Sequence, residues 1–407
     1  MDKRLLLEYA KLIVKCGANV QKNQLVVIKA PVEVYEFTRL VVEEAYKAGA
    51  SKVIVDYIDS INNRHDFLYE TKEELESISD YTISRAHYEV DNGACHISLT
   101  SPNPEALAGV DLKKVEAYSL ARGNKLSFLT DYSMNSIGQW CVAGVASKAW
   151  ADKVFPNEPN NVELLWTAIL KASHISAIDS ASSWLKHGDE ILEHAKLLNS
   201  YNFQKLNFKN GKGTDLEVYL ASENVFAGGD EYSSKGIRFS PNIPTEEVFG
   251  MPYKTKVNGI VYSTKPLNYQ GGLIEDFHLV FKDGKVISYD AKKGLELLKS
   301  LIEFDEGSSY LGEVALISHD SPISNMNVLF YNTLFDENAS CHLALGQSYS
   351  MNTKDGVNLS IEELKARGAN FSHTHVDFMF GSSDMSVIGT KADGKEIVIF
   401  KNGNFII

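Results

Sequence analysis

Residues 25–57 read LVVIKAPVEVYEFTRLVVEEAYKAGASKVIVDY. The first four positions are apolar and rich in β-branched residues, residues 32–48 place apolar side chains at helical spacing, and residues 52–57 again favour a strand. A helical pattern over residues 73–88 and a strand pattern over residues 95–99 continue this alternation. Such an order predicts a mostly parallel sheet with helices on both faces, and therefore an α/β fold for the first half of the chain.

Sheets of this kind often hold nucleotides, so a phosphate-binding loop is the first motif to look for. The chain contains neither GxGxxG nor GxxxxGK[ST], and the sequence GKGT at residues 211–214 is too short and precedes a strand pattern. A nucleotide-binding module would rest on the α/β pattern alone. The sequence therefore disfavours that function.

The pattern changes near residue 200. From residue 203 onward strands and turns follow one another: KLNFKNGKGTDLEVYL (205–220) is hairpin-like, and FHLVFKDGKVISYD (277–290) predicts a hairpin with Asp283 and Gly284 at its turn. We expect an N-terminal α/β domain over residues 1–200. A strand-rich α+β domain that binds metal and carries catalysis is expected over residues 201–407.

Composition limits the partners and the compartment. The net charge of −13 argues against general nucleic-acid binding, which favours a basic surface. No apolar run approaches the roughly 18 residues that would suggest a membrane span, and the start, MDKRLLLEYAKLIVK, places charges among its leucines like an amphipathic helix. The four scattered cysteines form no CxxC motif and no disulfide framework. We expect a cytoplasmic protein without nucleic-acid or membrane partners.

Metal-ligand residue types gather at three points of the second half. They are PTEEVF (244–249), DENASCHLALGQSY (336–349) and HTHVDFMFGS (373–382). Carboxylates mixed with imidazoles, with no cysteine pair among them, suit Zn²⁺, Co²⁺ or Mn²⁺ in a catalytic site, whereas a structural zinc site more often shows paired cysteines. The sequence thus indicates a metal-dependent hydrolase.

His375 and Asp377 form the strongest local motif. In a strand, residues two apart point to the same face, so one ion could take both side chains, and His373 would share that face. The ordinary alternative is an exposed polar strand face. The flanking Phe371, Phe378 and Phe380 favour burial instead, and buried ionisable groups need partners.

Glu337 and His342 form the second element. Five residues apart on a helix they would diverge, while a turn could bring both inward, and the small or apolar residues around His342 predict a dry setting. A lone histidine there would more often be a hydrogen-bonded core residue. Tyr349 would ordinarily be a packing aromatic, but a phenol at a metal site can donate to a developing oxyanion.

The remaining carboxylate candidates are Glu246, Glu247 and Glu313. Adjacent acids in an extended segment point opposite ways, so at most one of Glu246 and Glu247 enters a shared site. The residues alone do not choose between them, nor between a ligand role and a helix N-terminus capped by Thr245. Glu313 lies inside the nearly uncharged strand pattern YLGEVALI (310–317), where a carboxylate is costly unless a cation neutralises it.

Taken in order, PTEEVF, YLGEVAL, DENASCHLALGQSY and HVDFMFGS resemble the aminopeptidase T and aminopeptidase S (PepS) family of metallopeptidases, and residues 140–156 are similar to that family as well. The resemblance implies a two-domain, homodimeric, cytoplasmic exopeptidase with two divalent metal ions. It makes Tyr349 a catalytic neighbour and leaves the role of His373 open. The metal-site residues that it implies are Glu247, Glu313, Glu337, His342, His375 and Asp377.

The expected reaction is removal of N-terminal residues from short peptides by a water activated between two ions, which could be Zn²⁺, Co²⁺, Mn²⁺ or Mg²⁺. Glu313 is the candidate general base, and Tyr349 the oxyanion donor. Another dinuclear hydrolase, an amidase or a phosphoesterase, is the nearest alternative by chemistry. The facial triad of non-haem iron enzymes fits less well, because no histidine follows His375 and three further glutamates would have no role.

Overall fold

The computed structural model describes residues 1–103, 106–176 and 178–407. Its contacts divide the chain into two compact units, which are described separately. Unit 1 comprises Met1–Gly188 and Asp230–Pro244, and unit 2 comprises Asp189–Gly229 and Thr245–Ile407. The domain boundary at residue 200 stays a prediction, whereas the return of residues 230–244 to unit 1 was not foreseen.

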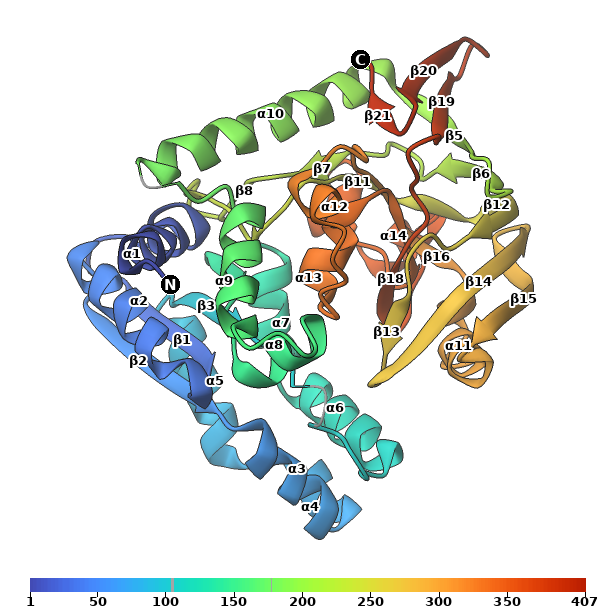
Figure 1. Cartoon of the computed structure of the whole chain (residues 1–407). Helices are drawn as coiled ribbons and strands as arrows, with labels where there is room; N and C mark the ends of the chain where they lie inside the picture. The colour runs from blue at the N-terminus through green and yellow to red at the C-terminus, as the bar shows by residue number, and fades with distance from the viewer. Residues whose placement is uncertain (104–105, 177) are drawn as a thin grey trace. The chain divides into compact units, whose positions relative to one another are not determined.

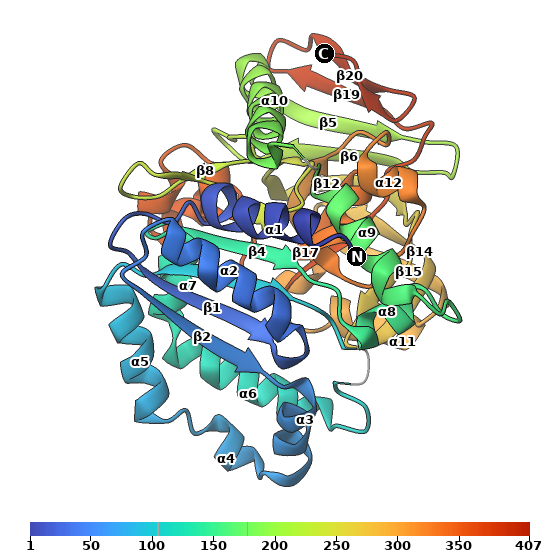
Figure 2. The same cartoon turned by 60° about the vertical axis from the view of Figure 1, so that its left-hand side comes forward.

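Unit 1 is built around a parallel sheet of five strands in the order β10-β4-β3-β1-β2. Helices α1 (Lys3–Leu12) and α2 (Tyr35–Lys47) lie on one side of it (Figures 1 and 2). Helices α5 (Asp80–Asp91), α6 (Leu112–Lys125) and α7 (Ser127–Met134) lie on the other side. This arrangement confirms the predicted α/β fold with a parallel sheet. The strands are β1 (Leu25–Pro31), β2 (Lys52–Ile58), β3 (Cys95–Thr100), β4 (Trp140–Gly144) and β10 (Asn242–Ile243), and β8 (Glu231–Tyr232) pairs with β9 (Arg238–Phe239).

Capping side chains begin several helices of unit 1, among them α4 and α5. Residues 73–88, predicted as one helix, form two helices instead, because the chain turns at residues 77–79 and Ser79 accepts a hydrogen bond from the Thr82 N–H to begin α5. The helices are α1 (Lys3–Leu12), α2 (Tyr35–Lys47), α3 (Ser60–Tyr69), α4 (Lys72–Glu76), α5 (Asp80–Asp91), α6 (Leu112–Lys125), α7 (Ser127–Met134), α8 (Lys148–Val154) and α9 (Asn161–Ala172), and α10 (Ser180–Tyr201) continues from unit 1 into unit 2.

Unit 2 contains two antiparallel sheets, in agreement with the predicted strand-rich character. One has five strands in the order β18-β17-β16-β11-β7, and the other has nine. The five-stranded sheet consists of β7 (Ala227–Gly228), β11 (Val248–Gly250), β16 (Leu311–Leu316), β17 (His342–Gly346) and β18 (His375–Met379). The nine-stranded sheet consists of β5 (Phe203–Lys209), β6 (Asp215–Leu220), β12 (Pro252–Tyr262), β13 (Leu267–Tyr269), β14 (Gly272–Lys282), β15 (Lys285–Lys293), β19 (Ser386–Lys391), β20 (Glu396–Lys401) and β21 (Asn404–Phe405).

Both predicted hairpins are confirmed. Strand β5 pairs with β6, and β14 pairs with β15 around Asp283 and Gly284, whose φ angles of 49° and 82° are both positive. Positive φ at both central residues is what a two-residue hairpin turn requires, and the Asp-Gly pair supplies it at little steric cost. The helices of unit 2 are α11 (Leu295–Ile302), α12 (Pro322–Met326), α13 (Thr333–Asp336) and α14 (Ile361–Ala366).

The main core of unit 2 joins residues of its two sheets. Phe378 on β18 packs edge-on against Phe277 on β14 at 5.5 Å between ring centroids, and Phe380 packs likewise against Phe208 on β5 at 5.2 Å. Burial of aromatic surface of this size makes a large contribution to the stability of the unit. The same face of the five-stranded sheet contributes Val314, Leu343, Leu345 and Phe378 to the core. The opposite face is therefore free to carry polar chemistry.

Candidate metal centre

The polar face of the five-stranded sheet collects the predicted ligands. Glu313 on β16 lies opposite Ala344 on β17, and Ala344 lies opposite Asp377 on β18, so these three side chains form one row across the sheet. Directly paired residues of neighbouring strands point to the same face. Because the middle residue of the row is an alanine, the two carboxylates face one another across an open position.

The two histidines lie on the same face, on either side of this row. Gly346 on β17 is opposite His375 on β18, and His342, two residues from Ala344 in the other direction, is opposite Ala315 and Met379. Gly346 has a φ of 113°, and a Cβ atom there would meet the carbonyl oxygen of Thr374. Alternation along β17 therefore gives a histidine and two small residues to the polar face, while Leu343 and Leu345 enter the core.

The backbone fixes the orientation of both imidazole rings. Nδ1 of His342 lies 3.0 Å from the carbonyl oxygen of Glu337, and Nδ1 of His375 lies 2.8 Å from that of Gln347. A backbone carbonyl can only accept, so each ring donates through Nδ1–H, and Nε2 becomes the ligand atom once it has released its own proton. Gln347 was not predicted as a site residue, and its contribution through the main chain leaves no sequence signal.

Two overlapping ligand groups result. Glu247, Glu313 and His342 form one, and Glu313, His375 and Asp377 form the other, with the potential ligand atoms of each group within 4.8 Å of one another. Glu313 belongs to both, because its Oε1 lies 3.2 Å from Nε2 of His342 and its Oε2 lies 3.5 Å from Nε2 of His375.

The remaining spacings complete the two groups. Oε2 of Glu247 lies 3.3 Å from Nε2 of His342, and Oδ1 of Asp377 lies 3.2 Å from Nε2 of His375. Ligands bound about 2.0–2.2 Å from one tetrahedral ion are themselves about 3.3–3.6 Å apart. These nitrogen–oxygen distances are therefore close to those of ligands that share an ion.

Burial makes this concentration of charge costly without a cation. Glu247, Glu313, His342 and Asp377 are all at least nine-tenths buried. Oδ1 of Asp377 has no hydrogen-bond partner among the described residues. An uncompensated buried charge costs several kcal/mol, roughly what removal of one partner of a buried ion pair costs. The donor set fits a divalent cation, and so does Oδ1 of Asp377, whose close neighbours are the Nε2 atoms of His375 and His342.

The ionisation of the carboxylates reflects their unequal surroundings. Burial acts to raise the pKa of Glu313, but hydrogen bonds to His342 and His375 outweigh it and lower this pKa to about 2. Burial raises the pKa of Glu247, despite its contact with His342. Burial and the charges of Asp377 and Glu247 raise the pKa of Glu337 well above its usual range. One carboxylate of the cluster is thus firmly ionised, while two resist ionisation.

Glu337 and Tyr349 lie beside the two ligand groups rather than within them. Glu337 opens a short 3₁₀ turn (Glu337–Ala339) and is coupled through its charge to Asp377, Glu247 and Glu313. The Tyr349 ring lies 4.9 Å from that of His375. Burial and the neighbouring carboxylates, Glu313 foremost, raise the pKa of the Tyr349 hydroxyl well above its usual value, so at neutral pH it keeps its proton and can donate.

Two other candidates from the sequence are separated from the cluster. The structure brings Glu247, and not its neighbour Glu246, to Glu313 and His342. His373 precedes β18 and is exposed, and its backbone N–H donates to Oδ2 of Asp305 at 2.7 Å. It belongs to neither ligand group of unit 2.

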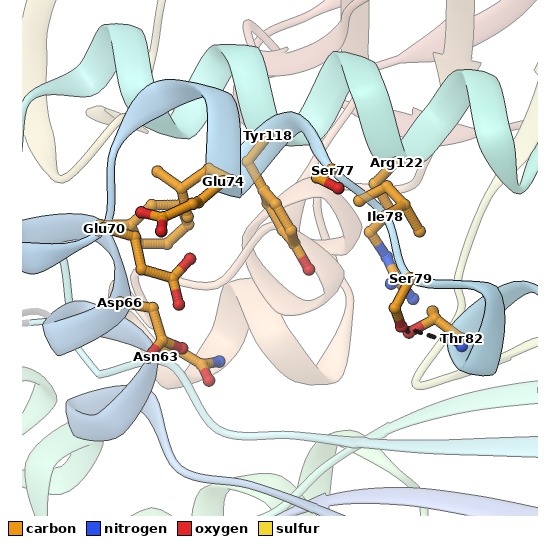
Figure 3. A pocket seen from close by; sticks show the side chains of 12 residues that line it. Asn63, Asp66, Glu70, Glu74, Ser77, Ile78, Ser79, Thr82, Tyr118 and Arg122 are labelled. Atoms are coloured by element: carbon orange, nitrogen blue, oxygen red, sulfur yellow. Dashed lines mark hydrogen bonds between the residues drawn. The ribbon is translucent and has the colours of Figure 1, made fainter.

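A hollow in unit 1 offers a contrast. It has a volume of about 250 Å³ and is lined by residues of α3 to α6. Figure 3 shows Asp66, Glu70 and Glu74 at one end and Arg122 at the other, with the Tyr118 ring between them. Glu74 already accepts hydrogen bonds from the N–H and hydroxyl of Thr71 at the start of α4. Its described lining contains neither histidine nor cysteine, so this hollow does not rival the metal centre.

With this geometry established, the chain can be compared with known proteins. The profile of the family described as thermophilic metalloprotease (M29) matches residues 2–405. The chain belongs to this family. Membership confirms the predicted family and the predicted class of enzyme, a metal-dependent peptide hydrolase.

Relatives of the M29 chain match it from end to end. Aminopeptidase AmpS of Bacillus subtilis is 43% identical over 399 residues, covering 98% of this chain and 97% of the relative. Aminopeptidase 2 of Geobacillus stearothermophilus is 40% identical over 403 residues, with coverages of 98% and 97%. The solved structure of wild-type AmpT from Thermus thermophilus superposes with a TM-score of 0.92 at 34% identity and covers 100% of both chains.

Two further features of the M29 chain concern membrane-spanning helices and disulfides. Within the parts of the chain that the structure describes, every helix is too short or too polar to cross a lipid bilayer. All four cysteines are buried and none is part of a disulfide.

Proposed function

We propose that this M29 chain is a metal-dependent aminopeptidase that removes single N-terminal residues from short peptides. Relatives that are named aminopeptidases, and that match this chain over nearly their whole length, support this reaction. The observation that carries the proposal is the pair of overlapping ligand groups joined by Glu313. A shared carboxylate is what holds two ions at the spacing of about 3.5–4 Å used by dinuclear hydrolases.

Two divalent ions, Zn²⁺, Co²⁺, Mn²⁺ or Mg²⁺, would be held by the six residues that the sequence predicted. Glu247 and His342 would serve one ion, His375 and Asp377 the other, and Glu313 both. Glu337 would complete the shell from its position beside the two groups. When bound, such ions lower the pKa of a water and polarise a carbonyl group.

The side chains around the ions have separate tasks. The carbonyl oxygens of Glu337 and Gln347 hold the imidazoles of His342 and His375 with Nε2 directed to the ligand position. Glu313 would accept the proton of the attacking water at a carboxylate oxygen and return it to the leaving amine. Tyr349, protonated at neutral pH, would donate its hydroxyl hydrogen to the oxyanion of the tetrahedral intermediate.

Charge supports cleavage at the amino end. The cluster is rich in carboxylates, and the whole chain has a net charge of −13, so a positively charged α-amine is attracted to its surroundings. We further propose a homodimer and a cytoplasmic location. The free, buried cysteines are in keeping with a reducing compartment, and sedimentation analysis of the purified chain would test the dimer.

The test compares one peptide with a free N-terminus and the same peptide acetylated. With Co²⁺ or Zn²⁺ present, the free peptide should lose its first residue, and acetylation should lower the rate by orders of magnitude because it removes the ammonium charge and adds bulk. A chelator should abolish hydrolysis and the ion should restore it. Internal cleavage of the acetylated peptide at a comparable rate would make the chain an endopeptidase. Faster turnover of a phosphate ester would favour a phosphoesterase.

A further inference from the structure

The parallel sheet of unit 1 has one apolar face and one, called the polar face, on which Lys29, His96 and Ser98 lie beside the buried apolar Leu25 and Val27. Val26, Ile28, Cys95, Ile97 and Cys141 lie on the first face and are fully buried or nearly so. The other face, formed by the alternate residues of β1, β3 and β4, is covered by α5 and α7. A sheet covered by helices on both faces normally shows apolar residues on both. Polar residues at such buried positions are therefore typical of functional sites.

A cavity of about 110 Å³ lies on the polar face. Its lining includes Lys29, His96, Ser98 and Trp140 of the sheet, together with Leu129 and Ser133 of α7. Their positions follow from register, since Lys29 pairs with Ser98 and His96 pairs with both Val27 and Trp140. Drug-sized ligands occupy roughly 300–1,000 Å³, so this cavity suits a ligand of only a few heavy atoms.

Two nitrogen atoms of the lining are buried without partners. They are Nδ1 of His96 and Nε1 of Trp140, and neither has a hydrogen-bond partner among the described residues. An indole N–H can only donate. Leaving such a donor buried and unsatisfied is unfavourable, and most native buried polar groups have a partner. Nε2 of His96 donates to the Glu89 carboxylate, so Nδ1 of the neutral ring is an acceptor. The indole N–H of Trp140 is therefore the atom that points to a ligand with hydrogen-bond acceptors.

The charges around the cavity indicate the sign of that ligand. Both carboxylate oxygens of Glu89 already have partners: one lies 3.1 Å from Nε of Arg85 and the other 3.2 Å from Nε2 of His96. Asp56, opposite Lys29 on β2, is paired with the same Arg85. The Lys29 ammonium acts on Glu89 only at a distance, and no hydrogen bond or ion pair of its own is found in the described part of the chain. The groups around the cavity that remain available to a ligand are therefore positively charged or hydrogen-bond donors.

We propose that this cavity binds a small oxyanion, a carboxylate or a phosphate. The ammonium of Lys29, the indole N–H of Trp140 and the hydroxyl of Ser98 would donate to its oxygens. The site lies wholly in unit 1 and does not depend on the proposed peptidase reaction, so either proposal can fail alone.

Calorimetric titration of the metal-loaded protein with inorganic phosphate, and separately with acetate, tests the site at constant ionic strength set with sodium chloride. We expect one anion per chain to bind in unit 1 and the dissociation constant to rise at least about tenfold in Lys29→Met, which removes a charged hydrogen bond. Lys52→Met, an exposed lysine of the neighbouring β2, is the matched control and should bind like the wild type. Comparing the two anions distinguishes a phosphate site from a carboxylate site.

A second variant distinguishes anion binding at the metal centre from anion binding in the cavity of unit 1. Asp377→Ala alters the metal centre of unit 2 and should keep the event that Lys29→Met weakens. A crystal soaked in selenate gives a reading that does not depend on any variant, and its anomalous peak should lie within hydrogen-bonding distance of Trp140 Nε1 and Lys29 Nζ. Equal affinity in wild type and Lys29→Met, or a cavity without selenate, would overturn the proposal.

Discussion

Glu313 shows at the scale of a residue why the site needs a cation. It is buried in the middle of a strand whose other members are apolar, and its two oxygens contact two different histidines. A carboxylate in that position is tolerated only with partners, because desolvation opposes its charge. The two imidazoles supply partial compensation. With both imidazoles neutral and bound as ligands, the negative charges of Glu313 and the three neighbouring carboxylates would be balanced by two divalent ions.

Tyr349 provides a prediction that separates catalysis from metal binding. Tyr349→Phe removes the hydroxyl and keeps the ring that packs against His375 and Phe249. We expect kcat for an aminoacyl amide to fall by about 10²–10³, the loss typical of one oxyanion donor, with the bound metal unchanged. Metal analysis and steady-state kinetics of the same preparation check both points. Full activity, or loss of metal, would remove the role assigned to Tyr349.

Proton release on metal binding is the second prediction. Burial opposes the charge on His342 and His375, but contacts with Glu247, Glu313 and Asp377 raise the pKa of both imidazoles well above its ordinary value in the metal-free chain. A raised pKa extends their charged form to higher pH than that of an ordinary imidazole, and an ion accepts only the neutral form.

Metal loading at pH 8 should therefore release about two protons per chain or more. Calorimetry in buffers of different ionisation enthalpy measures this number as a slope. Because the groups titrate together, the count belongs to the cluster rather than to one residue. A heat of binding that is independent of the buffer at pH 8 would contradict the prediction.

The elements show what a sequence can reveal about such a site. Two features could be predicted from the sequence because they depend on residues close in the chain. They are the carboxylate in the uncharged run of β16 and the alternation of His375 and Asp377 on β18. The register between strands was not. That Ala344 stands between Glu313 and Asp377 depends on pairing across three strands and on an irregularity after Leu311 in the pairing of β16 with β17. No local pattern encodes these features.

Ala344 accordingly yields a prediction at the scale of the sheet. Ala344→Leu would place an isobutyl group between the two carboxylates of the row, so we expect metal affinity to fall sharply. Ala369→Leu, in a separate small core of the same unit, is the control for overpacking alone. Both variants should lose about 1–3 kcal/mol of stability, measured by denaturant unfolding. Unchanged metal affinity in Ala344→Leu would show that the row does not define the site.

The whole molecule combines two units of different architecture along one chain. The metal centre lies entirely within unit 2, on the face of a sheet whose other face builds the core. Unit 1 receives its fifth strand from residues 242–243, far along the chain, and a two-residue strand is too short to predict from pattern. Composition and periodicity therefore indicated both architectures, while the crossing of the chain between units required the structure.

The shared position of Glu313 is the central claim, and anomalous diffraction from the metal-loaded crystal tests it most directly. Data collected on both sides of the metal absorption edge should give two peaks per chain, about 3.5–4 Å apart. One should lie within ligand distance of Glu247, His342 and Glu313, and the other within ligand distance of Glu313, His375 and Asp377. A single peak at full loading, or two peaks of which only one touches Glu313, would contradict the account.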